Sequence, residues 1–395
     1  MSIFRPNDEA ELIDVVQQAL ASEEPLELIA GGSKRGLGRP LQMPHVLDLG
    51  AFAGIRDYEP AELVLTAGAA TPLAEIEAAL DGARQMLAFE PADWRVLLGT
   101  SDKAATLGGV IACNLAGPRR IRQGAARDHF LGFHAVSGRG EAFKAGGRVV
   151  KNVTGYDLAK LMAGSYGTLA ALTEISVKVL PRPEATRTVL LPGLDIGQAL
   201  AAMTQALNSA HELTAAAHLP AEIASSGKAM TLARVEGPLP SVEARATALR
   251  RELASFGAAE ILGDDSSLTL WRGIRDVAPL AALTERAIWR LSLAPSAAPA
   301  LIAALGRKLD LRYFLDWGGG LAWLAVPPAQ DAGAAIIRGA IGSGHATLIR
   351  ASDALRAAIP VFQPQASEVA ALSARVKESF DPKRLFNRGR MYAAL

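Results

Sequence analysis

The residues with the clearest capacity for chemistry form a short glycine-rich turn near the N-terminus. The tripeptide Gly31–Ser33 directly follows Leu26–Ala30, an apolar segment typical of a strand. Glycines let the main chain approach a ligand closely, so that its N–H groups can converge on phosphate oxygens. The next two residues, Lys34 and Arg35, would add positive charge. The same pattern also fits a plain turn that binds nothing.

Two familiar phosphate-binding patterns do not match this turn. Gly31–Gly36 has the spacing of a P-loop, but Leu37 and Gly38 follow it where a P-loop has Lys and then Ser or Thr. No G-x-G-x-x-G pattern precedes a helix, so a Rossmann domain is not indicated. If the turn holds a ligand, a dinucleotide loop outside a helix is the better interpretation.

Two further stretches share this small-residue character. Gly99–Arg119 is nearly uncharged through its middle, and Lys151–Leu158 is followed by Gly164–Leu169 just before a strand expected at Leu172–Leu180. Runs of small residues allow main chain to lie against a flat ligand. Three such loops in one domain are hard to explain by packing alone, and together they favour a binding function.

Candidates for catalysis are few. The six histidines are scattered, and none has a metal-ligand spacing on an expected helix, so no metal site is predicted. His345 precedes an expected strand that ends at Arg350, whose guanidinium could bind a carboxylate substrate through two hydrogen bonds. His129 and His134 could lie near the glycine-rich loops, although partly buried structural histidines are the simpler interpretation.

Arginines and a cysteine accompany the second stretch. Arg119, Arg120 and Arg122 crowd at its end, where they could form a solvated turn or contact an anion or a partner. The sequence leaves both interpretations open. Cys113 lies in an apolar setting and is most simply a small filler against the ligand.

Composition limits the remaining function classes. The chain has 395 residues, half of them apolar, which is enough for two or three domains with proper cores. Its formal charge of +1 gives no electrostatic case for binding nucleic acid or an anionic membrane surface. One cysteine cannot hold an iron–sulfur cluster, which needs about four cysteine ligands. Without an apolar leader or a run of about 18 apolar residues, we expect a cytoplasmic protein.

The elements that must position the glycine-rich loops belong to an expected first domain, residues 1–182. Prolines at 181 and 183 favour an extended connection and mark its end. Apolar periodicity predicts helices at Pro6–Ala21 and Pro72–Leu80, and strands at Leu26–Ala30, His45–Leu49 and Leu63–Ala67.

A second domain is expected over residues 183–360, as an α+β unit with an antiparallel sheet covered by helices. The patterns predict strands at Thr188–Leu191, Thr214–Leu219, Met230–Val235, Ile288–Leu293 and Ala346–Arg350, a hairpin of Arg312–Trp317 and Leu321–Val326, and helices at Ile196–Ser209, Ser241–Phe256, Ala297–Leu305 and Gln330–Ile341.

The last segment, residues 361–395, begins with an amphipathic helix. Val369, Leu372, Val376 and Phe380 share one stripe of that helix, which Asp381 and Pro382 should end. The tail beyond is too short to fold alone and too apolar to remain in solvent. We therefore expect it to dock on the first domain.

Four motifs in order carry a specific resemblance. They are GGS, ATLGGVIACNLAGPRR, GGRVVKNVTGYDLAKLMAGSYGTLAALTEISVKVLPRP and FDPKRLFNRGRM. This order resembles the FAD-linked oxidases of the vanillyl-alcohol oxidase type and, within them, the FAD-binding E subunits of bacterial glycolate oxidases. The resemblance covers about residues 1–182 and the tail. It implies an α+β fold: a PCMH-type FAD-binding domain of two subdomains, an α+β cap domain, and a tail that returns to the FAD domain.

The resemblance also implies which residues contact FAD. Gly31, Gly32 and Ser33 would hold its diphosphate, and the diphosphate and isoalloxazine would be lined by Thr106, Gly108, Gly109, Cys113, Asn114 and Gly117. The adenine side would be flanked by Gly164, Gly167 and Leu169 through Leu172, and the tail would contribute Asn387. Two departures from the family pattern are Ala170-Ala171 in place of Gly-Ile and Arg388 in place of a proline.

Some relatives attach FAD covalently through a histidine near the first loop. Lys34 and Arg35 occupy that stretch here, so noncovalent FAD is expected.

The implied function is a subunit of a glycolate-oxidising complex. Its implied partners are a second FAD-linked oxidase subunit and an iron–sulfur subunit, with contact to the inner membrane only through them. Relatives that oxidise 2-hydroxy acids directly usually carry a His-x-Gly-Asp-Gly-Asn-type stretch, which this sequence lacks. Three functions therefore stay open: a redox-active FAD subunit, a flavin-bearing scaffold, and a free-standing 2-hydroxy-acid dehydrogenase such as one acting on D-lactate.

Overall fold

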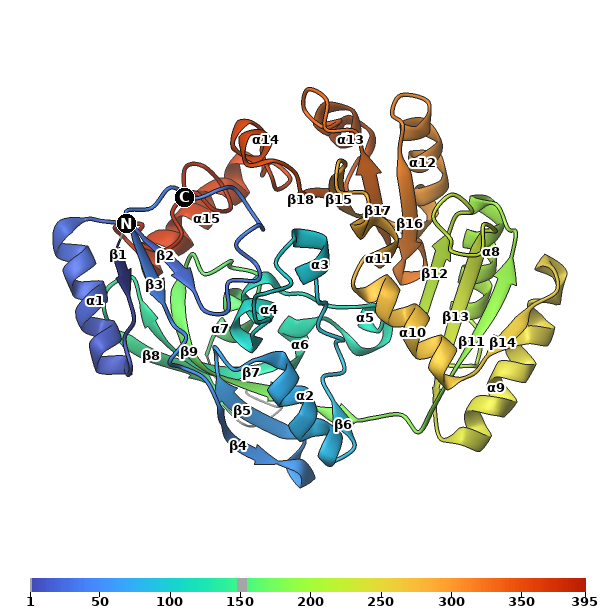
Figure 1. Cartoon of the computed structure of the whole chain (residues 1–395), viewed down its shortest axis with the longest axis horizontal. Coiled ribbons are helices and arrows are strands. Elements are labelled where there is room, and N and C mark those ends of the chain that lie inside the picture. The colour runs from blue at the N-terminus through green and yellow to red at the C-terminus, as the bar shows by residue number, and fades with distance from the viewer. Residues whose placement is uncertain (1, 148–154) are drawn as a thin grey trace. The chain divides into compact units, whose positions relative to one another are not determined.

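A computed structural model of the chain describes residues 2–147 and 155–395 (Figure 1). The chain divides into two compact units. The first comprises Met1–Leu115, Gly124–Arg182 and Pro364–Leu395, and the second comprises Ala116–Gln123 and Pro183–Gln363. The start of the third small-residue stretch, Lys151–Thr154, lies outside the described residues.

The first unit opens with a small parallel sheet of strands β1 (Ser2–Phe4), β3 (His45–Asp48) and β2 (Leu26–Ile29), in that order. Helix α1 (Glu9–Ser22) begins where the Asp8 side chain accepts a hydrogen bond from the Glu11 amide. Its apolar face, with Leu12 and Val16 fully buried, packs in one core with the sheet. The helix and the two later strands were predicted, whereas β1 was too short to leave a pattern.

A second, antiparallel sheet completes the two-subdomain arrangement of this unit. Its strand order is β4 (Ile55–Glu59), β5 (Val64–Gly68), β9 (Ala170–Lys178), β7 (Phe130–Ser137) and β8 (Ala142–Gly146). The shorter elements of the first unit are α2 (Leu73–Gly82), β6 (Gln85–Met86), α3 (Arg95–Leu98), α4 (Leu107–Cys113), α6 (Ala126–His129), α7 (Leu158–Met162) and β10 (Leu180–Pro181).

Helix α4 corrects one expectation. The second glycine-rich stretch is not a loop throughout, because Leu107–Cys113 are helical. Leu107, Val110 and Ile111 are buried at helical spacing, and their burial stabilises a short helix that contains two adjacent glycines.

The second unit contains one eight-stranded antiparallel sheet. The antiparallel sheet and seven of its strands were predicted, whereas the short strand Glu260–Leu262 was not. The strand order is β14 (Glu260–Leu262), β11 (Ala185–Pro192), β13 (Met230–Gly237), β12 (Ala215–Leu219), β16 (Arg312–Asp316), β17 (Leu321–Val326), β15 (Ala287–Ser292) and β18 (His345–Arg350). Its helices are α5 (Arg120–Gln123), α8 (Ile196–Leu207), α9 (Leu239–Glu252), α10 (Asp264–Arg275), α11 (Ala278–Ala281), α12 (Ala298–Gly306), α13 (Ala334–Ala340) and α14 (Asp353–Ala358).

Helix α13 is shorter than its predicted span of Gln330–Ile341. Gln330, Ala332 and Gly333 all have positive φ angles, of 52°, 51° and 74°. Left-handed backbone cannot continue a right-handed helix, so α13 begins only at Ala334.

Arginines attach the segment Ala116–Gln123 to the second unit. Arg119 donates two hydrogen bonds to the Glu236 carboxylate, Nε to Oε2 at 2.9 Å and Nη2 to Oε1 at 2.6 Å. The Arg120 guanidinium lies 4.5 Å from the centre of the Trp317 ring. Arg122 pairs with Glu212 at 2.7 Å. Arg119 is therefore neither a solvated turn residue nor an anion contact, because a buried carboxylate of its own unit already binds it.

The C-terminal segment belongs to the first unit. Helix α15 (Ser367–Phe380) precedes a tail in which Leu385 and Phe386 are fully buried, and Phe386 forms a parallel bridge with Leu26 of β2. The predicted docking of the tail on the first domain is confirmed. The predicted apolar stripe of α15 is only half correct, because Val369 and Leu372 are 51% and 53% exposed. The helix packs through its last turns.

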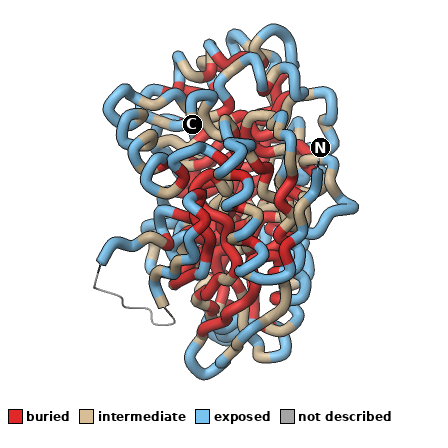
Figure 2. The backbone as a smooth tube through the Cα atoms, turned by 90° about the vertical axis from the view of Figure 1, so that its left-hand side faces the viewer, coloured by how far each residue is buried: buried red, intermediate tan, exposed pale blue. Residues whose placement is uncertain are grey.

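The burial of the residues agrees with these cores. In Figure 2, which colours the backbone by burial, the buried stretches gather toward the inside and the exposed stretches lie mainly along the outer turns. Within residues 2–147 and 155–395, no helix has the length and apolar character needed to cross a membrane.

Candidate functional site

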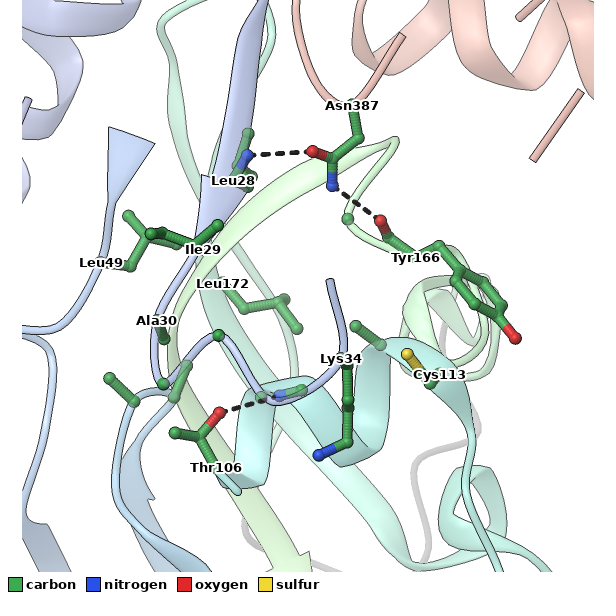
Figure 3. A pocket seen from close by; sticks show the side chains of 18 of the residues that line it. Leu28, Ile29, Ala30, Lys34, Leu49, Thr106, Cys113, Tyr166, Leu172 and Asn387 are labelled. Carbon is green, nitrogen blue, oxygen red and sulfur yellow. Dashed lines mark hydrogen bonds between the residues drawn. The ribbon is translucent and has the colours of Figure 1, made fainter. Parts of the chain in front are cut away.

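The three glycine-rich stretches meet around one cavity in the first unit (Figure 3). The empty space around it measures about 820 Å³, a volume that includes space open to solvent. Four segments supply most of its described lining: 28–35, 106–113, 165–172 and the tail at 387–390, and the rest is Leu49, Ala69 and Ala70. The predicted convergence of distant small-residue segments is thus present.

The first loop requires glycine at the point where it leaves strand β2. A Cβ atom on Gly31 would clash with the carbonyl oxygen of Ala104, in the segment just before α4. Gly32 has a φ of +76° and forms an isolated bridge with Ala104. The first loop is therefore pressed directly against the second stretch.

The second stretch presents the first turn of α4 to the cavity. Thr106 Oγ1 accepts a hydrogen bond from the Gly109 amide at 3.3 Å and so caps the helix. A Cβ on Gly108 would lie 2.8 Å from the Ala69 carbonyl oxygen. A Cβ on Gly109 would lie 3.2 Å from Thr106 Oγ1 and 3.3 Å from Lys34 Cδ. Both glycines keep the first loop, β5 and α4 close together.

Asn387 joins the tail to the third stretch. Its Oδ1 accepts a hydrogen bond from the Leu28 amide at 2.9 Å, and its Nδ2 donates one to the Tyr166 carbonyl at 2.8 Å (Figure 3). Gly167, with a φ of +68°, follows at the cavity wall. One tail side chain thus fixes the distance between strand β2 and the loop before β9.

The charged groups in the cavity lining favour an anion. Among the described lining residues, Lys34, Arg35 and Arg390 are cationic and none is a carboxylate. Arg390 Nη2 donates to the Lys34 carbonyl at 2.9 Å. Burial lowers the pKa of Lys34, because the cavity gives its ammonium less solvation than water does. Such a surplus of cations beside close-approaching glycines fits a diphosphate.

Cys113 adds a neutral surface to the same cavity. Burial raises the pKa of its thiol, so the side chain is uncharged near neutral pH. A neutral, polarisable sulfur at the end of α4 suits contact with an apolar or aromatic part of a ligand.

Most of the residues expected to contact FAD line this cavity. They are Gly31, Gly32, Ser33, Thr106, Gly108, Gly109, Cys113, Gly167, Ala170, Leu172 and Asn387. Five others are not in this lining: Asn114 accepts a hydrogen bond from the Arg127 amide, Gly164 donates to the Ile111 carbonyl, Leu169 and Ala171 are buried, and Gly117 accepts from Trp317 in the second unit. Direct contact with FAD remains a prediction for the whole set.

The structure adds lining residues outside that set. Ala69 and Ala70 follow strand β5 and face α4, and a Gly-Ala-Ala turn after an expected strand is the signal that could have identified them. Arg390 had no local signal, because it reaches the cavity only through the docking of the tail.

The two catalytic candidates lie in the second unit. Arg350 donates from Nη1 to the Ala281 carbonyl at 2.9 Å, and from Nη2 to the carbonyls of Leu283 and Arg286. This network ties the end of β18 to the segment around α11 and gives the guanidinium a structural role. His345 is exposed at the start of the strand. Their roles toward substrate remain predictions. The described residues contain no group of three or more His, Cys, Asp or Glu placed to hold a metal.

Comparison with known proteins identifies a cofactor-binding domain in the part of the chain that forms most of the cavity. Residues 2–146 match the model of the FAD binding domain family, and FAD is the cofactor of this domain. The chain is 36% identical over 384 residues to glycolate oxidase subunit GlcE of Escherichia coli (strain K12), covering 97% of both chains. It is 33% identical to glycolate oxidase subunit GlcD of Bacillus subtilis (strain 168) over 156 residues, 36% of this chain and 33% of that one.

Solved structures share the fold at low sequence identity. The 4-ethylphenol oxidase from Gulosibacter chungangensis aligns with a TM-score of 0.71 and 13% identity, covering 99% of this chain and 89% of that chain. An alkyldihydroxyacetonephosphate synthase aligns with a TM-score of 0.67 and 16% identity, covering 97% and 76%. These likenesses concern the fold alone, and they agree with the predicted α+β architecture.

Proposed function

This chain belongs to the family of glycolate oxidase subunit GlcE, and we propose that it is the FAD-binding subunit of a complex that oxidises glycolate to glyoxylate. The observation that carries the proposal is 36% identity across 97% of both chains. The cavity at the meeting point of the glycine-rich stretches supports it. Bound FAD supplies the two-electron acceptor for oxidation of a CH–OH group, a chemistry that no side chain provides.

The chain's own residues bind and orient the cofactor in this proposal. Gly31, Gly32 and Gly109 allow close approach of the main chain, and Asn387 keeps the two sides of the cavity at a constant distance. Lys34 and Arg390 supply positive charge opposite phosphate oxygens. Binding is noncovalent, because no histidine occurs in the first loop.

The proposal includes partner subunits. The chain has one cysteine, and an iron–sulfur cluster needs about four cysteine ligands, so single-electron transfer from FAD requires another chain. That chain is an iron–sulfur subunit, accompanied by a second FAD-linked oxidase subunit similar to GlcD. Any contact with the inner membrane is made through these partners.

A flavin-bearing subunit without its own substrate site is the second candidate. It is favoured by the lack of a metal-binding group among the described residues and by the commitment of Arg350 to backbone carbonyls. Substrate reduction of the bound flavin separates the two candidates, because only a chain with a complete site is reduced by glycolate.

Two experiments test the proposal. Tagged chain purified from its native host should bring down both partners and show iron absorbance that the chain expressed alone does not. The chain expressed alone is then titrated anaerobically with glycolate: rapid reduction of its FAD supports a redox-active subunit with its own substrate site, and FAD that stays oxidised while that of the intact complex is reduced supports the second candidate. A lone homo-oligomer from the native host that is fully active with glycolate or D-lactate would contradict the complex and favour a free-standing dehydrogenase.

A further inference from the structure

Two adjacent cations in the first loop have different partners. Arg35 donates to Glu27 from Nε at 2.8 Å and from Nη2 at 2.5 Å, so its charge is neutralised on strand β2. Lys34 extends instead toward the first turn of α4, where its Cδ lies 3.3 Å from the position of a Cβ on Gly109 (Figure 3). Only one of the two cations is available for a ligand.

The Lys34 ammonium has no carboxylate partner among the described residues. Its only hydrogen bond there runs from Nζ to Ser33 Oγ at 3.2 Å. The charged and titratable groups that act on it are Asp93 and Arg95, which pair with each other at 2.7 Å, and Cys113 on α4, while Arg390 bonds its carbonyl. A half-buried ammonium with only a hydroxyl partner is poorly stabilised until an anion arrives.

We infer that Lys34 is the ionic ligand that the first loop provides for the FAD diphosphate, and that its ammonium, rather than the guanidinium of the neighbouring Arg35, supplies the charge on this side of the cavity. The inference rests on the proposed function only in requiring that the cavity holds FAD. The ammonium bonds the Ser33 hydroxyl, and the Lys34 side chain lies beside Gly109 in the first turn of α4, so it is placed between the two glycine-rich segments.

Burial makes this contact dependent on pH. In the protein without ligand, desolvation lowers the pKa of Lys34, and a bound diphosphate would raise it again. The charged form binds more tightly, so the contribution of Lys34 to affinity is complete below the lowered pKa. It is lost as pH rises from that value toward the higher pKa of the bound state.

The test measures dissociation of FAD from the holoprotein, by the flavin fluorescence that appears on dilution, between pH 7.5 and 10. Wild-type affinity should fall with rising pH, by at most tenfold per pH unit. Lys34→Met should weaken binding about 10- to 100-fold at pH 7.5 and remove the Lys34 contribution to the slope. Lys34→Arg should keep the affinity and also remove that contribution, because arginine stays charged throughout.

Control variants separate the role of Lys34 from the roles of neighbouring residues. Arg35→Met should weaken binding much less than Lys34→Met and should keep the wild-type slope, because Glu27 already neutralises the Arg35 charge. Cys113→Ser should keep the slope, which excludes titration of the thiol. Because the flavin ring itself titrates at high pH, displacement of FAD by ADP provides a second readout with a diphosphate but no flavin. ADP affinity should show the same dependence on Lys34.

The outcomes are distinct. An unchanged affinity in a folded Lys34→Met protein would overturn the inference, as would equal effects of Lys34→Met and Arg35→Met. Weaker FAD binding with unchanged ADP binding would also overturn it, because the ammonium would then serve the flavin ring. None of these measurements involves glycolate, so failure of the proposed substrate and failure of Lys34 are told apart.

Discussion

Lys377 Nζ lies 2.7 Å from Asp381 Oδ2, and both side chains are buried at the end of helix α15. The ammonium also donates to the carbonyls of Thr168 and Phe386, while the carboxylate accepts from the amides of Leu385 and Phe386. The pair therefore holds together the helix, the loop before β9 and the returning tail. The tail carries Asn387, which lines the cavity, so this ion pair helps to hold Asn387 in place.

Replacing Lys377 should destabilise the first unit strongly. Lys377→Met leaves the Asp381 carboxylate buried without its cation, which costs about 3 to 5 kcal/mol. The urea midpoint for loss of circular dichroism and bound FAD should fall accordingly. Lys383→Ala is the matched control, because Lys383 pairs with Glu23 at the surface and should cost less than about 1 kcal/mol. Equal losses in the two variants would contradict the structural role of the buried pair.

Gly109 should tolerate no charged side chain. In Gly109→Asp, the new side chain would meet Thr106 Oγ1 and Lys34 and would place a carboxylate where we propose that the FAD diphosphate binds. We expect purified variant with less than about a tenth of the wild-type flavin content. Gly82→Asp is the control, since a Cβ there meets nothing within 4 Å.

The wild-type chain should contain noncovalent FAD. Acid precipitation should release the flavin into the supernatant, and the ratio of flavin to protein absorbance gives the occupancy. A stable, colourless wild-type protein would show that the cavity does not hold FAD, and flavin retained in the pellet would show a covalent bond.

His218 should make the second unit sensitive to mild acid. Its ring is buried on β12, where Nδ1 lies 2.9 Å from Thr231 Oγ1, and burial lowers its pKa to about 4. In the unfolded chain the His218 ring binds a proton below about pH 6.5, but in the folded chain it does so only near pH 4. The free energy of unfolding therefore decreases as pH is lowered from 6.5 toward 4. The loss between pH 7 and pH 5 should be about 2 kcal/mol.

Tryptophan fluorescence can measure this loss, because four of the five tryptophans belong to the second unit. His218→Gln should remove the corresponding part of the pH dependence in urea unfolding. His345→Gln, at an exposed position of the same unit, should not. A pH dependence that is identical in wild type and His218→Gln would exclude His218 as its source.

The stabilising effect of the buried Glu236 carboxylate should depend on its ion pair with Arg119. Burial alone would raise the pKa of this carboxyl, but Arg234 and Arg119 outweigh burial and lower it to about 2. The carboxylate therefore stabilises the fold above about pH 4.5, and this contribution is lost as pH falls toward 2. Arg119→Met should cost about 2 kcal/mol at pH 7 and shift the acid loss to higher pH. Arg122→Met, which breaks the exposed pair with Glu212, should cost under about 1 kcal/mol.

Much of the local structure followed from the sequence because it depends on near neighbours. The spacing of Leu12 and Val16 predicted α1, and the apolar run at 26–30 predicted β2. Strand β1 and helix α4 escaped prediction. A three-residue strand carries no measurable alternation, and a helix with adjacent glycines exists only because its apolar face is buried.

By itself the sequence determined where main chain could approach a ligand, since the need for glycine at Gly32 and Gly167 is a local matter of positive φ. Tertiary structure alone decided which charges face that ligand. Lys34 and Arg35 are adjacent and both cationic, yet Arg35 pairs with Glu27 and Lys34 does not. Asn387 closes the cavity through a bond to Leu28, 359 positions away. Such contacts depend on how distant segments pack, and no local pattern encodes them.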